Sequence, residues 1–280
     1  MSKYRTKESK KSRNECLIST QNYIIMGNYE TYLQTYRLRL FYGLHCSGNY
    51  QQFSPLLFLT FQTSYDIPLA KITLLITLNF SVQLITDLIS PLFIDKIGYR
   101  VSVVLAHIFS ALGLVLLPVL PSFFSDPSTG LFIAVIVYAV GGGLLEVLIS
   151  PIVEASPTDN KEKAMSLLHS FYCWGHVGVV LISTLFFVLF GTVNWMYLSL
   201  FWALVPIANT FFFLKVPVNH LIADGERGLT LNELFKTKAF WLLIVLMVCA
   251  GASEQGVSQW ASVFAERGLG VSKTAGDLAG

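Results

Sequence analysis

Long apolar runs separated by short polar segments dominate the sequence. A helix needs about 20 predominantly apolar residues to cross the hydrocarbon core of a bilayer. The pattern therefore predicts seven membrane-spanning helices, near residues 38–62, 68–93, 101–120, 131–153, 164–190, 193–215 and 239–264. An eighth begins in the final segment, VSKTAGDLAG.

The first predicted span is the least regular. Its first half is rich in polar and charged side chains, namely Arg39, His45, Ser47, Asn49, Gln51 and Gln52. Only residues 53–61 are properly apolar. Two interpretations stay open: this helix lines a water-filled cavity, or the residues before about 52 are not the native start of the protein.

The composition agrees with this pattern. Hydrophobic residues make up 54% of the 280 residues and charged residues 13%, and the mean hydropathy is +0.59. Soluble domains carry about 25% charged residues, so the composition excludes a soluble globular domain. We expect an all-α membrane protein whose main partner is the lipid bilayer. The net charge of +2 gives no indication of a nucleic-acid partner.

Lys and Arg are distributed unevenly over the predicted loops. Sixteen of the 19 lie in residues 1–39 or in the segments 94–100, 154–163 and 215–238, and the other three are Lys71, Arg267 and Lys273. Loops rich in Lys and Arg stay in the cytoplasm because positive charge resists translocation. We therefore expect a multi-pass protein of the cell membrane with its N-terminus in the cytoplasm.

The loop lengths predict four parts. Residues 1–34 form a polar cytoplasmic tail, residues 35–215 a bundle of six spans, residues 216–238 a cytoplasmic link and residues 239–280 the start of a second bundle. The four cysteines include no CxxC pair, so we expect neither a disulfide framework nor a metal site. We expect a monomer without a cofactor.

A short motif follows the second predicted span, in SPLFIDKIGYR (90–100). It resembles the signature of the major facilitator superfamily between its second and third helices, with Asp95, Gly98 and Arg100 at matching positions. In that family the motif latches the two halves of the transporter together on the cytoplasmic side. The alternative is an ordinary cytoplasmic turn, in which Gly98 permits the tight bend.

The layout of the chain is similar to the same superfamily. Its members usually carry twelve spans, in two bundles joined by a long cytoplasmic link, and work by alternating access. The resemblance implies the superfamily fold, with an N-terminal six-helix bundle followed by the first helix of the second bundle. We expect this sequence to be a truncated form of such a protein.

Glu146 lies inside the fourth predicted span. An acidic side chain at the centre of a membrane helix costs about 2.5–3.5 kcal/mol on the mildest scale, so it should face protein or water. Gly142, Gly143 and Ser150 share its face of the helix. Small residues there allow close helix approach or leave room for a substrate. The alternative role for Glu146 is a buried hydrogen bond between helices.

The segments GGGLLEVLISP and AMSLLHSFYCWG are similar to the fucose–galactose–glucose–proton symporter branch of the superfamily. In that branch a glutamate on the fourth helix takes part in proton coupling, which implies this role for Glu146. The fifth helix of the branch carries a Gln and an Asn where this sequence has His169 and Tyr172. The resemblance implies a sugar-like substrate and H+ as the coupling ion.

Polar residues form one stripe on the fifth predicted span, since His169, Tyr172 and His176 are spaced at i, i+3 and i+7. His169 and Glu146 are both roughly 7–11 Å from the cytoplasmic boundary at a rise of about 1.5 Å per residue. A Glu146–His169 pair would be a proton acceptor near neutral pH. A histidine donating to a backbone carbonyl is an equally good alternative, and a metal site lacks a third ligand.

The seventh predicted span contains a polar patch, GASEQGVSQW (251–260). Its Glu254 and Gln255 are candidates to bind substrate or a proton. Trp260, like Trp174 in the fifth span, is a candidate to stack on a flat substrate, and the alternative is an interfacial aromatic belt. In the superfamily the first, fourth and seventh helices line the central cavity. Asp87 is expected near the cytoplasmic interface, in a supporting role.

These observations favour a secondary active transporter of a small polar solute. An enzyme is not expected, because the sequence contains no GxSxG or HExxH motif. A transporter-like sensor or binding subunit without transport activity is the alternative that the sequence leaves open.

Overall fold

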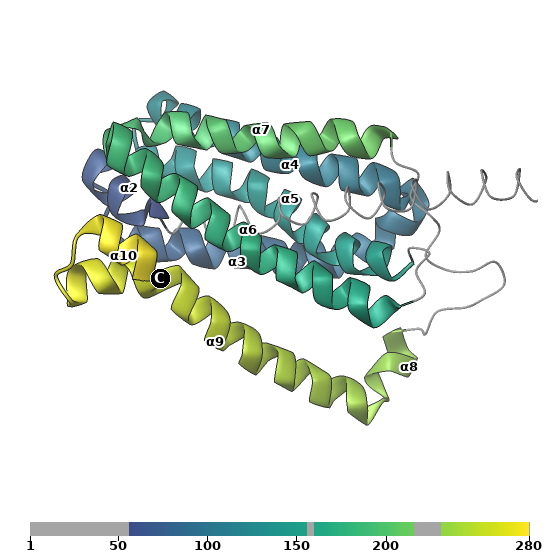
Figure 1. Ribbon diagram of the computed structural model, residues 1–280. Helices are drawn as coiled ribbons and strands as arrows, with labels where there is room; N and C mark the ends of the chain where they lie inside the picture. Colours follow the sequence, from purple (N-terminus) through teal and green to yellow (C-terminus); the bar gives the residue numbers. More distant parts are fainter. Residues whose placement is uncertain (1–55, 156–159, 216–230, 280) are drawn as a thin grey trace, which may run out of the picture. The chain divides into compact units, whose positions relative to one another are not determined.

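A computed structural model describes residues 56–155, 160–215 and 231–279, all within the compact unit Phe41–Gly280. Nearly all of these residues are helical and none is in a strand. The α-helices are α2 (Phe58–Tyr65), α3 (Leu69–Ile97), α4 (Tyr99–Val119), α5 (Pro127–Glu154), α6 (Lys161–Phe190), α7 (Trp195–Lys215), α8 (Leu231–Phe235), α9 (Lys238–Gly268) and α10 (Lys273–Ala279) (Figure 1). Two short 3-10 segments, η1 (Leu120–Phe123) and η2 (Thr192–Asn194), precede α5 and α7.

Six of these helices are long and apolar enough to cross a membrane, with bounds of Leu69–Ile94, Tyr99–Phe123, Pro127–Glu154, Lys161–Phe190, Thr192–Lys215 and Lys238–Gly268. They correspond to the second to seventh predicted spans, so the prediction of an all-α membrane protein is confirmed. Of the first predicted span, only its last part, around α2, belongs to the described residues. The polar stretch before residue 52, the tail 1–34 and most of the link 216–238 lie outside them.

The helix ends follow local sequence signals. Asp126 is the N-cap of α5 and is followed by Pro127, which suits the first turn of a helix. Asn160 caps α6 by accepting from the backbone N–H of Lys163 at 2.8 Å. Gly98 has a φ of +88° between α3 and α4, a conformation that favours glycine. The tight bend expected at Gly98 is thus confirmed.

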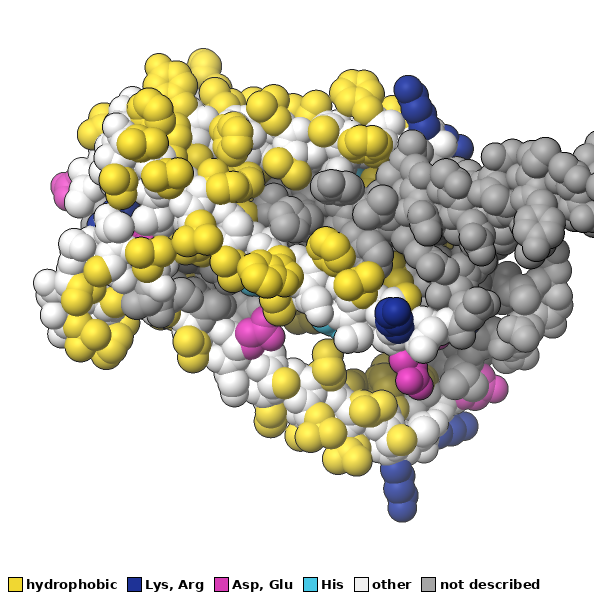
Figure 2. All heavy atoms as spheres, in the orientation of Figure 1, with side chains coloured by type: hydrophobic (Ala, Val, Ile, Leu, Met, Phe, Trp, Pro, Cys, Tyr) yellow, Lys and Arg dark blue, Asp and Glu magenta, His cyan; other side chains and the backbone are white. Residues whose placement is uncertain are grey.

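Consecutive membrane-length helices run in alternating directions, which creates two ends. We call the end near Gly98, Glu154, Lys215 and Lys238 the basic end, because most of the basic loops are there. The end near Asp66, Gly191 and Leu269 is the opposite end. Figure 2 shows mainly hydrophobic side chains on the flank of the molecule, with most visible Lys and Arg atoms at the basic end. Such a flank suits contact with lipid.

The core of the bundle forms where α4 packs against α5 and α7, and α3 packs against α5. Glycines allow α4 and α5 to approach closely, since a Cβ atom on Gly113 would lie only 2.6 Å from the backbone nitrogen of Tyr138. Hydrogen bonds tie α7 to its neighbours. Ser199 donates to the Leu114 carbonyl at 2.7 Å, and the indole of Trp202 donates to Ser183 at 3.0 Å.

An ion pair joins α3 to the start of α5 at the opposite end. The Lys71 ammonium donates to Asp126 at 2.7 Å and to the Ser128 hydroxyl at 2.9 Å. The hydroxyl and backbone N–H of Ser128 also donate to the Asp126 carboxylate. These donors, Lys71 first, lower the pKa of Asp126 to about 2.

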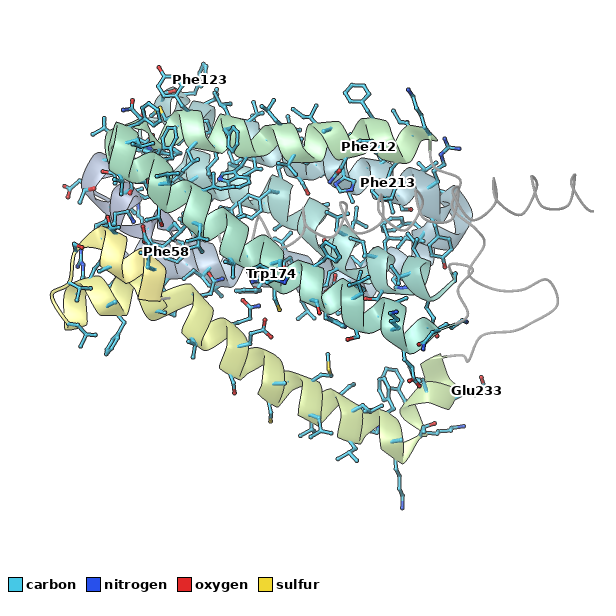
Figure 3. The ribbon with its side chains drawn as sticks, in the orientation of Figure 1. Phe58, Phe123, Trp174, Phe212, Phe213 and Glu233 are labelled. Atoms are coloured by element: carbon cyan, nitrogen blue, oxygen red, sulfur yellow. The ribbon has the colours of Figure 1, made fainter. Side chains whose placement is uncertain are left out.

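Helix α9 differs from the others in its burial. None of its apolar window is buried. It meets the bundle at the opposite end, where the ring centroid of Trp260 lies 6.2 Å from that of Phe58. Phe58, on α2, is labelled in Figure 3. From there α9 runs away from α6 toward α8 (Figure 1).

Candidate functional site

A half-open cavity of about 680 Å³ is lined by residues of α3, α5, α6 and α9. Ligand pockets in proteins typically measure about 300–1,000 Å³. Half of its lining residues are polar or ionisable, namely Gln83, Asp87, Glu146, Ser150, His169, Tyr172, Glu254 and Gln255. The apolar remainder includes Phe80, Leu145, Met247 and Ala250. The cavity therefore offers both hydrogen-bonding groups and hydrophobic surface in the middle of membrane-length helices.

Glu146 is exposed on the α5 wall of the cavity. The glycines before it explain how α3 comes so close. A Cβ atom on Gly143 would lie 3.1 Å from an Asp87 carboxylate oxygen, and one on Gly142 would lie 3.1 Å from the Gln83 amide nitrogen. The small residues on the face of Glu146 thus allow close helix approach, which is one of the two roles that the sequence suggests.

Two further carboxyl groups lie near Glu146. Asp87 on α3 and Glu254 on α9 line the same cavity, and each interacts electrostatically with Glu146. One oxygen of Asp87 is buried without a hydrogen-bond partner among the described residues. Carboxylates that share a low-dielectric site repel each other strongly unless a cation or a proton offsets their charge.

Helix α6 contributes His169 and Tyr172, one turn apart. Tyr172 interacts electrostatically with both Glu146 and Glu254, so these residues form one group across three helices. His169 is exposed on the cavity wall. Within the residues that the structure describes, no hydrogen bond or ion pair joins Glu146 to His169. The direct Glu146–His169 pair stays a prediction, although both side chains line the same cavity.

Of the remaining residues that the sequence suggests for substrate binding, one lines the cavity and two do not. Gln255 lines the cavity beside Glu254. Trp260 is not among the residues that line it, because the six residues from Glu254 to Trp260 carry the chain to the opposite end, where Trp260 packs beside Phe58. Trp174 does not line it either, with 69% of its surface exposed. In this structure Trp260 packs beside Phe58 and Trp174 is exposed, and stacking of either tryptophan on a substrate stays a prediction.

The motif after α3 has a visible role inside the bundle. The Arg100 side chain donates to the backbone carbonyl of Phe213 at 3.3 Å, near the C-terminal end of α7. Carbonyls in the last turn of a helix lack partners within the helix, so this contact supports the α4–α7 junction. The Phe213 ring, labelled in Figure 3, stacks on the His107 ring with centroids 5.2 Å apart. The side chain of Asp95 lies outside the described residues, so its latch role stays a prediction.

Sequence reasoning missed the contribution of α3. It placed Asp87 in a supporting role near the cytoplasmic interface, but Asp87, Gln83 and Phe80 form a wall of the cavity. A usable signal was present, because Asn79, Gln83 and Asp87 repeat every four residues along an apolar helix. Gln83 and Asn79 are buried and joined by a hydrogen bond of 3.4 Å.

The side chains that line the cavity can donate and accept hydrogen bonds. No group of three His, Cys, Asp or Glu side chains in the described ranges could hold a metal ion. The cavity combines carboxylates, two amides, an imidazole and a phenol with the ring of Phe80. Such a lining can bind a small solute through several hydrogen bonds and an aromatic contact.

Comparisons with known proteins agree with this architecture. The sequence profile of the Major Facilitator Superfamily matches residues 40–280. The structure is similar to the crystal structure of a D-xylose-proton symporter, with a TM-score of 0.65 and 15% sequence identity. The match covers 88% of this chain and 64% of that one. At this identity the likeness shows the fold alone.

No match was found among the curated proteins. The superfamily profile nevertheless covers most of the sequence, and the helical architecture agrees with it. The chain belongs to the Major Facilitator Superfamily.

Proposed function

We propose that this chain forms part of a secondary active transporter that moves a small polar, sugar-like solute across the cell membrane together with protons. The observation that carries the proposal is the placement of Glu146 and Glu254 on two sides of one cavity, in helices of membrane-spanning length. An acidic group in contact with lipid would cost about 2.5–3.5 kcal/mol or more. A hydrated cavity explains why two of them are tolerated there.

The mechanism follows from where the two glutamates lie. Glu146 belongs to α5 of the bundle, whereas Glu254 belongs to α9, which meets the bundle mainly at the opposite end. When both are ionised, their repulsion opposes any movement of α9 toward α5. A proton on Glu146 removes one of the two charges. Protonation would then favour closure of α9 over a bound solute, which is the coupling step of alternating access.

The proposed class of solute follows from the mixture of hydrogen-bonding and aromatic side chains that line the cavity. Gln83, Gln255 and Tyr172 offer hydrogen-bond donors and acceptors, and Phe80 offers an aromatic face. A polyhydroxylated solute of sugar size fits this combination, because its hydroxyl groups both donate and accept. The D-xylose-proton symporter of similar fold transports such a solute together with protons. His169 is proposed to help the carboxyl groups exchange protons with water.

The orientation in the membrane is part of the proposal. Loops at the basic end carry most of the Lys and Arg residues, so we place this end and the N-terminus in the cytoplasm. Because α9 diverges from the bundle in this direction, the cavity in this conformation would face the cytoplasm. The protein is proposed to act as a monomer without enzymatic activity, and H+ is the proposed coupling ion.

The test is uptake into proteoliposomes that hold the full-length transporter of which this chain forms part, under an imposed pH gradient and with a panel of labelled sugars. Glu146→Gln should abolish gradient-driven uptake but retain exchange of labelled for unlabelled solute, because the neutral amide imitates the protonated acid. Glu154→Gln is the matched control, since Glu154 lies on the same helix but does not line the cavity, and it should behave as wild type.

Two outcomes would count against this function. Gradient-driven uptake at the wild-type rate in Glu146→Gln would show that Glu146 is not the coupling group. Wild-type protein that binds a solute but shows neither uptake nor exchange would favour the alternative of a transporter-like sensor or binding subunit.

A further inference from the structure

Three residues of α3 line the cavity from one face of that helix. Phe80, Gln83 and Asp87 are spaced at i, i+3 and i+7, so they follow one another along the same face. Asn79 lies one turn before Gln83. The wall that α3 contributes therefore carries an aromatic ring, an amide and a carboxylate in a row.

The amide of Gln83 is held in one orientation. Its nitrogen donates to the side-chain oxygen of Asn79 at 3.4 Å, and a Cβ atom on Gly142 of α5 would lie 3.1 Å from the same nitrogen. Gln83 is only 4% exposed and nevertheless lines the cavity. Because the nitrogen is engaged beside Asn79 and α5, the amide oxygen is left to accept a hydrogen bond from a ligand.

Asp87 adds negative charge to this wall. One of its oxygens is buried beside Gly143 of α5, without a hydrogen-bond partner in the part of the chain that the structure describes. Glu146 and Glu254 line the same cavity, whereas no described residue that lines it is a lysine or an arginine. Carboxylates removed from bulk water are costly unless a positive charge or a proton offsets them. His169, the described lining residue that can become a cation, belongs to α6 rather than α3.

We propose that Phe80, Gln83 and Asp87 form a binding site for a protonated amine on the solute, and that the solute is an amino sugar. An ammonium group has three N–H donors and no acceptor, so it matches a wall that offers an amide oxygen and a carboxylate. A positive charge is also attracted to the face of an aromatic ring such as Phe80. Transport of the amino sugar rests on the proposed function, whereas binding of the amine at this site does not.

The amine site leaves Glu146 available for the coupling proton. Asp87 and Glu146 interact electrostatically where α3 and α5 approach each other. An ammonium group bound to Asp87 offsets one of these two charges, and a proton on Glu146 offsets the other. Solute and proton therefore use neighbouring carboxyl groups on different helices.

Asn79 is a positioning residue for this site. It is 8% exposed and is not among the residues that line the cavity. Its contribution comes through the hydrogen bond that orients the amide of Gln83. Without this bond, the Gln83 amide can turn and present its nitrogen, which would repel an ammonium group rather than bind it.

The experiment measures equilibrium binding to the full-length transporter of which this chain forms part, held in lipid nanodiscs. The probes are glucosamine, N-acetylglucosamine and glucose, at a pH at which the glucosamine amine is protonated. The second and third probes have a similar ring without the charged group. Glucosamine should bind about tenfold more tightly than either neutral sugar, because hydrogen bonds to a charged group are stronger than those between neutral groups.

The variants are compared by the ratio of the Kd of N-acetylglucosamine to the Kd of glucosamine. Asp87→Asn removes the charge and should lower this ratio about tenfold, to near one. Gln83→Leu and Asn79→Leu should each lower it by a smaller factor, about threefold. A general defect in folding would weaken the binding of both sugars alike and would leave the ratio unchanged.

Thr86→Val is the matched control on the same helix. Thr86 is the neighbour of Asp87 in the sequence, but it does not line the cavity, and its hydroxyl donates to the backbone carbonyl of Val82 at 2.8 Å. Replacing this hydroxyl with a methyl group changes the polarity of α3 without changing the cavity wall. The ratio should therefore stay at the wild-type value.

Equal binding of glucosamine and the neutral sugars by wild type, or no binding of glucosamine, would overturn the amine site. Uptake of neutral sugars in that case would leave the transport proposal intact. A wild-type ratio in both Asp87→Asn and Gln83→Leu would also overturn the site, and if Asp87→Asn does not fold, Gln83→Leu decides by the same ratio. Selective binding of glucosamine without any uptake would support the amine site while removing the transport proposal.

Discussion

The crossing of α4 and α5 at Gly113 allows a stability prediction whose magnitude comes from the structure. In Gly113→Ala the new Cβ atom would lie closest to the Cβ atom of Tyr138, and 2.6 Å from its nitrogen and 2.8 Å from its Cα atom. Favourable contacts between heavy atoms begin at about 3.5 Å, so the two helices must separate by at least roughly 0.9 Å. The obstacle is backbone, which cannot rotate away as a side chain can.

Overpacking of this kind costs about 1–3 kcal/mol. A glycine-to-alanine change in a helix also gains about 0.5–1 kcal/mol of intrinsic propensity, which offsets part of the cost. Gly256→Ala on α9 is the control, because a Cβ atom there would meet nothing within 4 Å. This variant should show the gain in helix propensity without the cost of overpacking. The free energy of unfolding of Gly113→Ala should therefore fall below that of Gly256→Ala by about 1–3 kcal/mol.

Reversible unfolding by SDS in mixed lipid–detergent micelles measures both variants on one scale. A Gly113→Ala protein as stable as Gly256→Ala would refute the close crossing of α4 and α5. The crossing matters for the site, because α5 carries Glu146 and its position depends on packing between α3 and α4.

Two further predictions concern titratable groups. The pKa of Asp126 is lowered to about 2, so its ion pair should stabilise the folded state fully above about pH 4, the ordinary pKa range of an aspartate, and should lose this contribution as the pH falls toward 2. The free energies of unfolding of wild type and Asp126→Asn in detergent should therefore become equal at the acid end of this range. A difference between them that stays constant with pH would contradict the ion pair. His169→Ala should shift the pH optimum of solute uptake, since His169 shares the cavity with the carboxyl groups, and an unchanged pH profile would leave His169 with a structural role.

The membrane-length helices were predictable because span length and apolar composition are imposed by the bilayer itself. Residues 68–93 were expected as a span and Leu69–Ile94 is observed. The same logic exposed Glu146 and Glu254, since a carboxyl group is conspicuous within an apolar run. For such residues the sequence alone predicts both their position in the helix and a neighbouring cavity or protein contact.

Other features depend on which helices become neighbours, and the sequence of one helix does not contain this information. Asp87 belongs to the cavity because Gly143 lets α3 approach α5. Trp260 packs beside Phe58 because α9 meets α2 at the opposite end. The contact between Arg100 and Phe213 joins residues more than a hundred positions apart. Each of these requires the tertiary arrangement of two helices.

The transport proposal requires that the acidic residues of α5 and α9 border a water-filled cavity rather than lipid or a dry core. Accessibility of single cysteines on α5 to a small water-soluble thiol reagent tests it directly. Ser150→Cys lines the cavity, whereas Leu148→Cys is buried. We predict rapid labelling at position 150 and none at position 148, whereas an unreactive thiol at position 150 would contradict the inference.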